Sequence, residues 1–216
     1  MKYPIIENTI PQNKRAGLNE KILMSVLQGR KDYTNAEIYN NYTGIGGLHG
    51  LHRDDFDNYH EYAEAKRAIE KGQFFTPHDV CRKMVELAAP AASDTVLDMC
   101  CGIGNFYNHL PNEYNAYGFD IDEDAVKVAK RLYPDANISV DDMRFYDPKM
   151  KFDIILGNPP FNLTIEDVRS QHFYTHKAYW LLNPGGLMLL VMPYSYLQSA
   201  SADRMYINMM NRDFSL

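Results

Sequence analysis

The chain has 216 residues, 45% of them hydrophobic, which is enough for one substantial core and a smaller appendage. Its net charge of −6 disfavours a nucleic-acid-binding surface, because phosphate backbones attract basic proteins. Most of the acidic excess lies in residues 81–216, which hold twelve Lys or Arg against seventeen Asp or Glu.

Local sequence features argue against several protein classes. The three cysteines are odd in number and lack Cys-x-x-Cys spacing, and the seven histidines are scattered, so neither a disulfide framework nor a metal site is predicted. The longest apolar stretch, around residues 187–192, is too short for a membrane span. Pro4, Glu7 and Pro11 occupy the place of a signal peptide's apolar core, so we expect a cytoplasmic protein.

The first 72 residues predict a helical region. Expected helices cover residues 18–27, 34–42 and 59–71. Thr34 and Glu37 form a capping box at the start of the second helix, and Gly72 closes the third. The glycine-rich residues 44–48 follow a helix rather than a strand, which argues against a phosphate loop. We therefore divide the chain into residues 1–72 and a second unit, residues 73–216.

Residues from Phe74 onward alternate between strands and helices. Thr76 as N-cap and Pro77 at the first helical position begin a helix whose buried stripe holds Val80, Met84 and Leu87. Expected strands cover residues 95–100, 116–120, 138–140, 152–156 and 187–192, and helices lie near residues 105–109, 123–132 (capped by Asp122) and 170–182. This pattern predicts an α/β fold with a doubly wound, mostly parallel sheet, in which ligands bind at the carboxyl ends of the strands.

Candidate site residues follow the first two strands of this sheet. Asp98 precedes a turn that contains Gly102 and Gly104, and these glycines allow the backbone to approach a ligand closely. Asp120 ends the second strand, where a carboxylate can accept both hydroxyl groups of a ribose. A single acid of this kind is usually an ordinary loop carboxylate, so the prediction depends on suitable groups at consecutive strand ends.

The next two strands end in further candidates. In the sequence Asp141-Asp-Met-Arg144, one of the two carboxylates can accept from an adenine amino group while Met143 packs on the ring. After the fourth strand, the Asn158 amide oxygen and the Pro159 carbonyl offer two acceptors to one NH2 group, and Phe161 can stack on the ring that carries it. This arrangement favours methylation of a planar amino nitrogen; a strand-ending Pro-Pro turn with a core phenylalanine is the alternative.

The resemblance to a known family rests on five features in chain order: Phe74-Phe-Thr-Pro77, Asp98-x-x-x-Gly-x-Gly104, Asp120, Asp142 and Asn158-Pro-Pro-Phe161. Together they resemble S-adenosylmethionine-dependent DNA adenine-N6 methyltransferases, in the class whose Phe-Thr-Pro motif precedes the glycine motif. The resemblance covers about residues 72–193 and implies a Rossmann-like class I methyltransferase core, DNA as partner and no metal. It implies a cofactor site formed by Phe75, Thr76, Asp98, Cys100, Gly102, Gly104, Asp120, Ile121, Asp142, Met143 and Asn158, and a catalytic site formed by Asn158, Pro159, Pro160 and Phe161.

Within the implied cofactor site, Thr76 holds the methionine carboxylate and Asp98 with the glycine turn seats the methionine portion. Asp120 binds the ribose, Ile121 packs on the adenine ring of the cofactor, and Asp142 accepts a hydrogen bond from the amino group of that adenine. In addition, residues 42–48 resemble a segment ahead of the methylase in large bacterial mobile-element proteins.

The chain departs from this family at its end. Only a helix near residues 202–211 is expected after the last strand, whereas the family continues with two antiparallel strands and a target-recognition domain. We therefore expect an incomplete core that binds cofactor, binds DNA weakly through regions partly missing here, and turns over near background. A methyltransferase for protein glutamine or RNA adenine remains an alternative, as does a non-catalytic nucleic-acid- or partner-binding relative.

Overall fold

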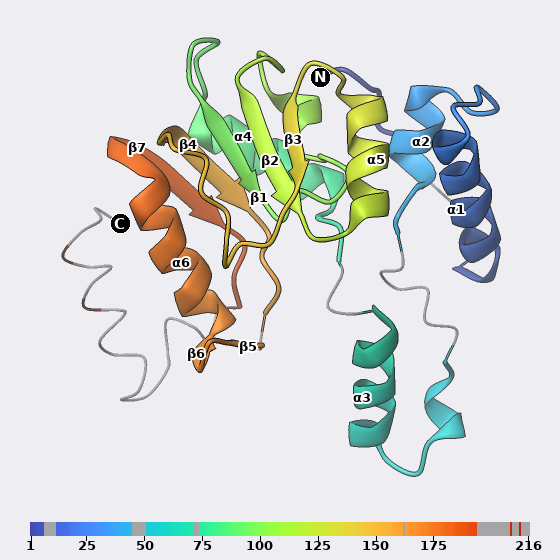
Figure 1. Ribbon diagram of the computed structural model, residues 1–216. Helices are drawn as coiled ribbons and strands as arrows, with labels where there is room; N and C mark the ends of the chain where they lie inside the picture. Colours follow the sequence, from blue (N-terminus) through green and yellow to red (C-terminus); the bar gives the residue numbers. More distant parts are fainter. Residues whose placement is uncertain are drawn as a thin grey trace.

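The computed structural model describes residues 1–6, 12–44, 51–70, 74–161 and 163–193, together with residues 208 and 212. Its centre is a five-stranded sheet in the order β3–β2–β1–β4–β7, in which every neighbouring pair is parallel (Figure 1). The strands are β1 (Val96–Met99), β2 (Ala116–Asp120), β3 (Asn137–Val140), β4 (Phe152–Gly157) and β7 (Leu182–Leu190). All five strands predicted from the sequence are present.

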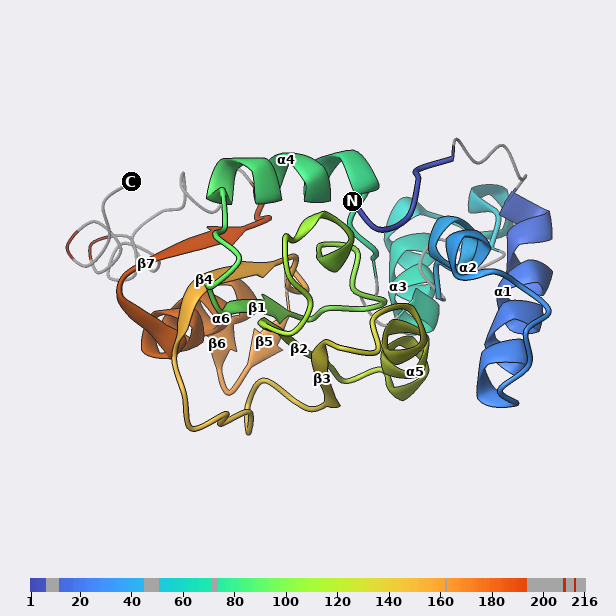
Figure 2. The same cartoon turned by 90° about the horizontal axis from the view of Figure 1, so that it is seen from above.

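Both faces of the sheet are covered, as Figure 2 shows from above. On one face lie α4 (His78–Ala88) and α5 (Glu123–Leu132), and on the other lie α6 (Ser170–Leu181) and the connection 141–151. Successive residues of β1 therefore enter different cores: Val96 packs with the α4 and α5 side chains, and Leu97 with those of α6. This two-sided burial explains the continuous apolar strands and confirms the predicted doubly wound fold.

The N-terminal helices α1 (Gln12–Leu27) and α2 (Asn35–Asn41) pack against α5. Thr34 caps α2 and forms the predicted capping box with Glu37. Tyr3, Ile22 and Ile38 belong to the same hydrophobic cluster as the α5 side chains, so this part of the N-terminal region shares the core of the sheet.

Helix α3 (Tyr59–Glu70) packs against the short 3-10 helix η1 (Arg53–Asp55). None of the helices in the described ranges is long and apolar enough to cross a membrane. The predicted closing residue of α3, Gly72, lies outside the described residues, as do most of the glycine-rich segment and the proposed unit boundary. The division at residue 72 therefore stays a prediction.

Two predictions about α4 were wrong. Its N-cap is Pro77 rather than Thr76, because Pro77 has an extended backbone (φ −55°, ψ 142°), and no side chain among the described residues hydrogen-bonds to this end of the helix. Leu87 is 75% exposed, whereas Cys81 and Val85 are buried. These two residues are one helical turn apart, so the buried stripe is rotated away from Leu87.

Other differences are local. The helix expected at residues 105–109 is a single 3-10 turn, η2 (Tyr107–His109). A small antiparallel hairpin of β5 (Thr164–Ile165) and β6 (Val168–Arg169) precedes α6 and was not predicted, because each strand has only two residues. The expected helix at residues 202–211 lies almost entirely outside the described residues.

Candidate functional site

The carboxyl ends of β1, β2 and β4 lie side by side, because these strands are neighbours in parallel register. Met99 pairs with Phe119 of β2 and with Gly157 of β4. The end of β3 adjoins that of β2 through the pairing of Val140 with Asp120. The four strand ends with predicted site residues thus share one edge of the sheet, where ligands of parallel α/β sheets bind.

The turn after β1 requires glycine for two reasons. Gly102 and Gly104 have φ of +52° and +80°, in the left-handed region. A Cβ at Gly102 would also lie 2.9 Å from the Phe75 ring, and one at Gly104 would lie 2.6 Å from the Tyr107 ring. The absence of side chains therefore allows Phe75, which precedes α4, to pack directly on the turn.

Asp98 is a buried carboxyl group without a hydrogen-bond partner. It is 1% exposed, and neither side-chain oxygen accepts a hydrogen bond from the described residues. Burial raises the pKa of Asp98 well above its ordinary range, and the nearby charge of Asp120 raises it further. A buried acid with two unused acceptors is unfavourable by itself and suits a ligand that brings positive charge or several donors.

Asp120 is held in place by the backbone around it. Its Oδ2 accepts from the Gly102 N–H at 2.7 Å, and its Oδ1 accepts from the Asp122 N–H at 2.9 Å. Burial raises the pKa of Asp120, while the hydrogen bonds from Asp122 and Gly102 act in the opposite direction. Asp122 itself caps α5, accepting from the Asp124 and Ala125 N–H groups, as predicted. The next residue after Asp120, Ile121, is 72% exposed, which leaves an apolar surface beside this carboxylate.

The residues after β3 are less favourably placed for the predicted contacts. Asp142 forms an ion pair with Arg144, whose hydrogen bond lowers the pKa of Asp142. Met143 is 3% exposed and packs with Leu97 and Phe119 in the α6-side core. The structure therefore does not favour packing of Met143 on an adenine ring, because the turn directs this apolar side chain inward.

Asn158 has an oriented side chain at the end of β4. Its Nδ2 donates to the Phe74 carbonyl oxygen at 3.5 Å, while its Oδ1 is buried and accepts from no described residue. Pro159 is buried, and Pro160 and Phe161 are partly exposed. The end of β4 thus carries a buried amide oxygen that no described residue uses, three residues before the partly exposed Phe161.

The segment before α4 is joined to the glycine turn by a residue that sequence reasoning missed. The Asn105 Nδ2 donates to the Thr76 carbonyl oxygen at 2.9 Å, and the buried Asn105 Oδ1 accepts no hydrogen bond from the part of the chain that the structure describes. Phe75, Thr76 and Asn105 line a cavity of about 130 Å³, together with Tyr42 and Thr43 of the N-terminal region. In the sequence, only the position of Asn105 directly after Gly102-Ile-Gly104 could have indicated that it belongs to the site.

Tyr174 of α6 was also missed. Its hydroxyl oxygen accepts from the Cys100 thiol at 3.3 Å, at the point where the backbone of Cys100 has a φ of +62°. This contact attaches the tip of β1 to a helix more than seventy residues away in the sequence. No group of three or more His, Cys, Asp or Glu side chains in the described part of the chain is arranged to hold a metal ion.

Residues 53–184, more than half of the chain, match the family described as N-6 DNA Methylase. A curated relative is Type II methyltransferase M.CvrRI from Paramecium bursaria Chlorella virus XZ-6E, which is 30% identical over 99 residues. This alignment covers 44% of this chain and 26% of that protein. The chain thus spans about a quarter of this relative's length.

Two solved structures have the same fold. A protein assigned as a modification subunit of a type I restriction enzyme from Vibrio vulnificus YJ016 has a TM-score of 0.54 and 19% identity, covering 76% of this chain and 45% of that one. A protein assigned as a class I S-adenosylmethionine-dependent methyltransferase from Listeria monocytogenes has a TM-score of 0.59 and 12% identity, covering 92% of this chain and 72% of that one. At these identities the likeness concerns the fold.

Proposed function

This chain belongs to the N-6 DNA methylase family, and on that premise we propose that it transfers a methyl group from S-adenosylmethionine to the N6 amino group of adenine in DNA. The observation that carries this proposal is the orientation of Asn158. Because its NH2 group donates to the Phe74 carbonyl oxygen, its buried Oδ1 is left to accept from a substrate.

Asp98 supports the choice of cofactor. S-adenosylmethionine supplies an electrophilic methyl group on a sulfonium and also carries an ammonium group and a ribose. The unpartnered carboxyl of Asp98 fits the ammonium end, because a cation offsets both the burial and the neighbouring charge of Asp120. Asp120 is anchored where it can accept from ribose hydroxyls, and the exposed Ile121 can cover the adenine ring.

The residues at the end of β4 perform the chemical step. Asn158 Oδ1 and the Pro159 carbonyl accept the two hydrogens of the adenine amino group, which concentrates its lone pair on nitrogen, while Phe161 stacks on the base after it leaves the helix. This nitrogen would then take the electrophilic methyl group that bound S-adenosylmethionine supplies, with the sulfur as leaving group. The nitrogen becomes tetrahedral and loses one proton to solvent, so no strong general base is needed.

Methyl incorporation from labelled S-adenosylmethionine tests the assignment. Purified chain in excess over substrate is offered DNA, RNA and protein separately, and the products are digested to identify the methylated atom. We expect N6-methyladenine from DNA. Asn158→Ala should abolish transfer while the affinity for S-adenosylhomocysteine stays within a few-fold.

The matched control is Asn112→Ala, which removes a partly exposed asparagine whose Nδ2 donates to the Ala92 carbonyl oxygen far from the site. This variant should transfer methyl groups at the unaltered rate. Methylation of glutamine or RNA by the unaltered protein would contradict the DNA assignment, and an active Asn158→Ala would contradict the assigned role of Asn158.

A further inference from the structure

A hollow of about 620 Å³ lies on the α6 face of the sheet and borders the edge described above at Arg144, which pairs with Asp142. It is bounded by residues 144–151 and by the C-terminal half of α6, and none of its lining residues is a predicted site residue. The connection from β3 to β4 crosses this face without a helix, since residues 141–151 are all non-helical. Parallel strands are usually connected through a helix, and the hollow lies where that helix is missing.

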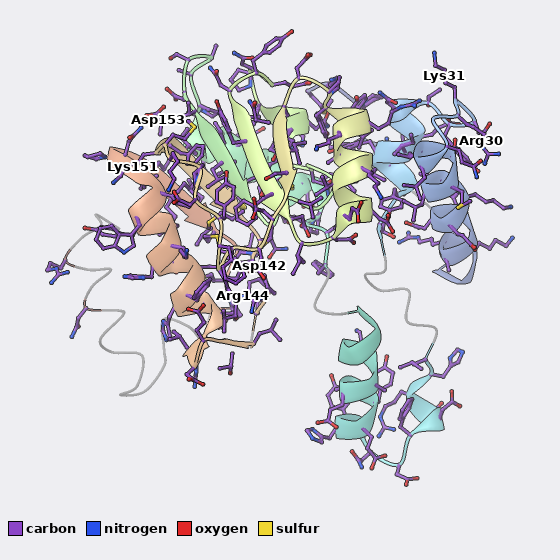
Figure 3. All side chains as sticks on the ribbon, in the orientation of Figure 1. Arg30, Lys31, Asp142, Arg144, Lys151 and Asp153 are labelled. Atoms are coloured by element: carbon purple, nitrogen blue, oxygen red, sulfur yellow. The ribbon has the colours of Figure 1, made fainter. Side chains whose placement is uncertain are left out.

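Positive charge is concentrated around this hollow. The basic lining residues are Arg144, Lys149, Lys151 and Lys177, against one carboxylate, Asp147. In Figure 3, Arg144 lies toward the carboxyl edge of the sheet and Lys151 toward the opposite edge, so the cations extend across the face. The whole chain has a net charge of −6, but beyond about 8 Å salt screens most of that charge, so the local excess governs what binds here.

The existing partners of these cations are weak ones. Arg144 pairs with Asp142, and Lys149 with Asp147, at sites where the basic side chains are about half exposed or more. Lys177 donates to the Arg144 carbonyl oxygen at 3.3 Å. Exposed ion pairs contribute little free energy, so an incoming anion can displace these carboxylates.

Of the three aromatic residues that line the hollow, two are exposed beside the cations. Phe145 is 73% exposed and Trp180 is 60% exposed. The Arg144 guanidinium lies over the Phe145 ring at 5.2 Å, and the Trp180 indole N–H donates to the His176 Nε2 at 3.1 Å, which orients the ring. Lys177 and Trp180 are three residues apart on α6 and therefore share one face of the helix.

We propose that this hollow binds a single-stranded segment of nucleic acid. Its phosphates would contact Lys151 and Lys177, and its bases would stack on Phe145 and Trp180. Such binding rests on the proposed function, because a base must be unstacked from DNA before it is methylated and the adjoining strand is then locally unpaired. The hollow would hold that strand outside the catalytic edge.

The pattern of the lining favours nucleic acid over an acidic protein segment. A single strand presents a phosphate and a flat base in regular alternation, and proteins that hold such strands place aromatic rings beside basic side chains. In the hollow, Phe145 directly follows Arg144, and Trp180 lies one helical turn after Lys177. An acidic peptide would engage the lysines but would have no regular partner for two exposed rings.

Trp180 provides the test, because it is the only tryptophan of the chain. An oligothymidylate of about 12 nucleotides is titrated into the full chain while the indole emission is recorded at several salt concentrations. We expect saturable quenching. Trp180→Ala, measured with a labelled oligonucleotide, should weaken binding about tenfold, which corresponds to one stacked base.

Charge reversal identifies the surface. The double variant Lys151→Glu with Lys177→Glu should weaken oligonucleotide binding at least about tenfold. It should also reduce the slope of log binding constant against log salt concentration by about 1.4, the value for two lost phosphate contacts on a single strand. The matched control is Lys83→Glu with Lys130→Glu, which changes the same charge on α4 and α5 and should stay within about twofold.

Three results would overturn the proposal: no quenching, equal weakening by both double variants, or quenching by polyglutamate as strong as by the oligonucleotide. The last result would assign the hollow to an acidic protein. Binding of S-adenosylhomocysteine and methyl transfer to DNA are measured separately on the same samples. If cofactor binding or methyl transfer is absent while the oligonucleotide still quenches Trp180, the result would count against the proposed function. The assignment of a single strand to the hollow would stand.

Discussion

The Asn158 side-chain amide donates to the Phe74 carbonyl oxygen at 3.5 Å, so the end of β4 is attached to the segment that precedes α4. In this contact the amide nitrogen is the end that faces Phe74, and the amide oxygen accepts from no described residue. The contact also means that the segment with Phe75 and Thr76, the glycine turn on which Phe75 packs, and the residues after β4 form one connected structure.

Asn158→Asp tests the orienting contact. Aspartate keeps an acceptor for the substrate but cannot donate to the Phe74 carbonyl oxygen, and its charge repels that oxygen. We expect the single-turnover rate of methyl transfer, measured with the protein in excess over DNA, to fall about 100-fold through misplacement of the acceptor, with the affinity for S-adenosylhomocysteine within a few-fold. Asn112→Asp loses a similar contact away from the site and should retain full activity. Unimpaired transfer by Asn158→Asp would show that the contact with Phe74 does not position the amide.

Asp98→Asn should affect stability and binding in opposite directions. The pKa of Asp98 is raised in the folded state, so the folded protein binds a proton at this carboxyl more tightly than the unfolded chain does. As the pH rises above the pKa that Asp98 has in the unfolded chain, this acid therefore lowers the free energy of unfolding. We expect the asparagine variant to be more stable at pH 8 by about 1–2 kcal/mol, with the difference shrinking toward acidic pH. Its affinity for S-adenosylmethionine should fall at least about tenfold.

Urea unfolding at several pH values and calorimetric titration measure these two effects. The control is Asp135→Asn, because Asp135 is exposed and should leave both quantities unchanged. A destabilised Asp98→Asn at pH 8 would mean that the carboxylate has a partner in the folded protein.

Much of the sheet could be predicted because its signals are local in sequence. The predicted and observed bounds agree at both ends of β2 and α5, where an apolar run is followed by the Asp122 cap. Leu87 was misassigned because α4 has apolar residues on more than one stripe, and only the packed sheet selects Cys81 and Val85. The hairpin before α6 is too short to give a periodic signal.

The parts of the site that escaped prediction depend on contacts between distant segments. Asn105 donates to the Thr76 carbonyl, and Tyr174 accepts from Cys100, across 29 and 74 positions of sequence. The local sequence around Asn105 and Tyr174 has no pattern that would indicate these contacts. The strand-end acids could be predicted, because parallel strands place their carboxyl ends together whatever the connections between them.

Gly102→Ala should cost more stability than Gly29→Ala. Both glycines have a positive φ, +52° and +63°, so both variants carry strain of about 1–2 kcal/mol. A Cβ at Gly29 meets nothing within 4 Å, whereas one at Gly102 lies 2.9 Å from the Phe75 ring, which adds about 1–3 kcal/mol. Urea unfolding measures the difference. Only Gly102→Ala should also weaken cofactor binding, because it displaces Phe75; equal cofactor affinity in the two variants would contradict a role for the turn.

Alkylation of the three cysteines tests where the cofactor lies. Cys100 is partly exposed at the tip of β1, whereas Cys81 and Cys101 are 0% and 6% exposed and serve as internal controls. We expect N-ethylmaleimide to modify Cys100 first, as measured by mass spectrometry of the digested protein. Desolvation at this partly exposed position raises the pKa of Cys100, so the fraction of reactive thiolate, and with it the rate, should rise about tenfold per pH unit through the neutral and mildly alkaline range.

S-adenosylhomocysteine should slow this reaction in proportion to its occupancy of the site, because Cys100 lies between Asp98 and the glycine turn. The same ligand should leave the rates at Cys81 and Cys101 unchanged, which separates direct coverage of Cys100 from a general stabilisation of the fold. Equal protection of all three cysteines would indicate stabilisation alone. Absence of protection at Cys100, under conditions where calorimetry shows the ligand bound, would mean that the cofactor does not lie against the tip of β1.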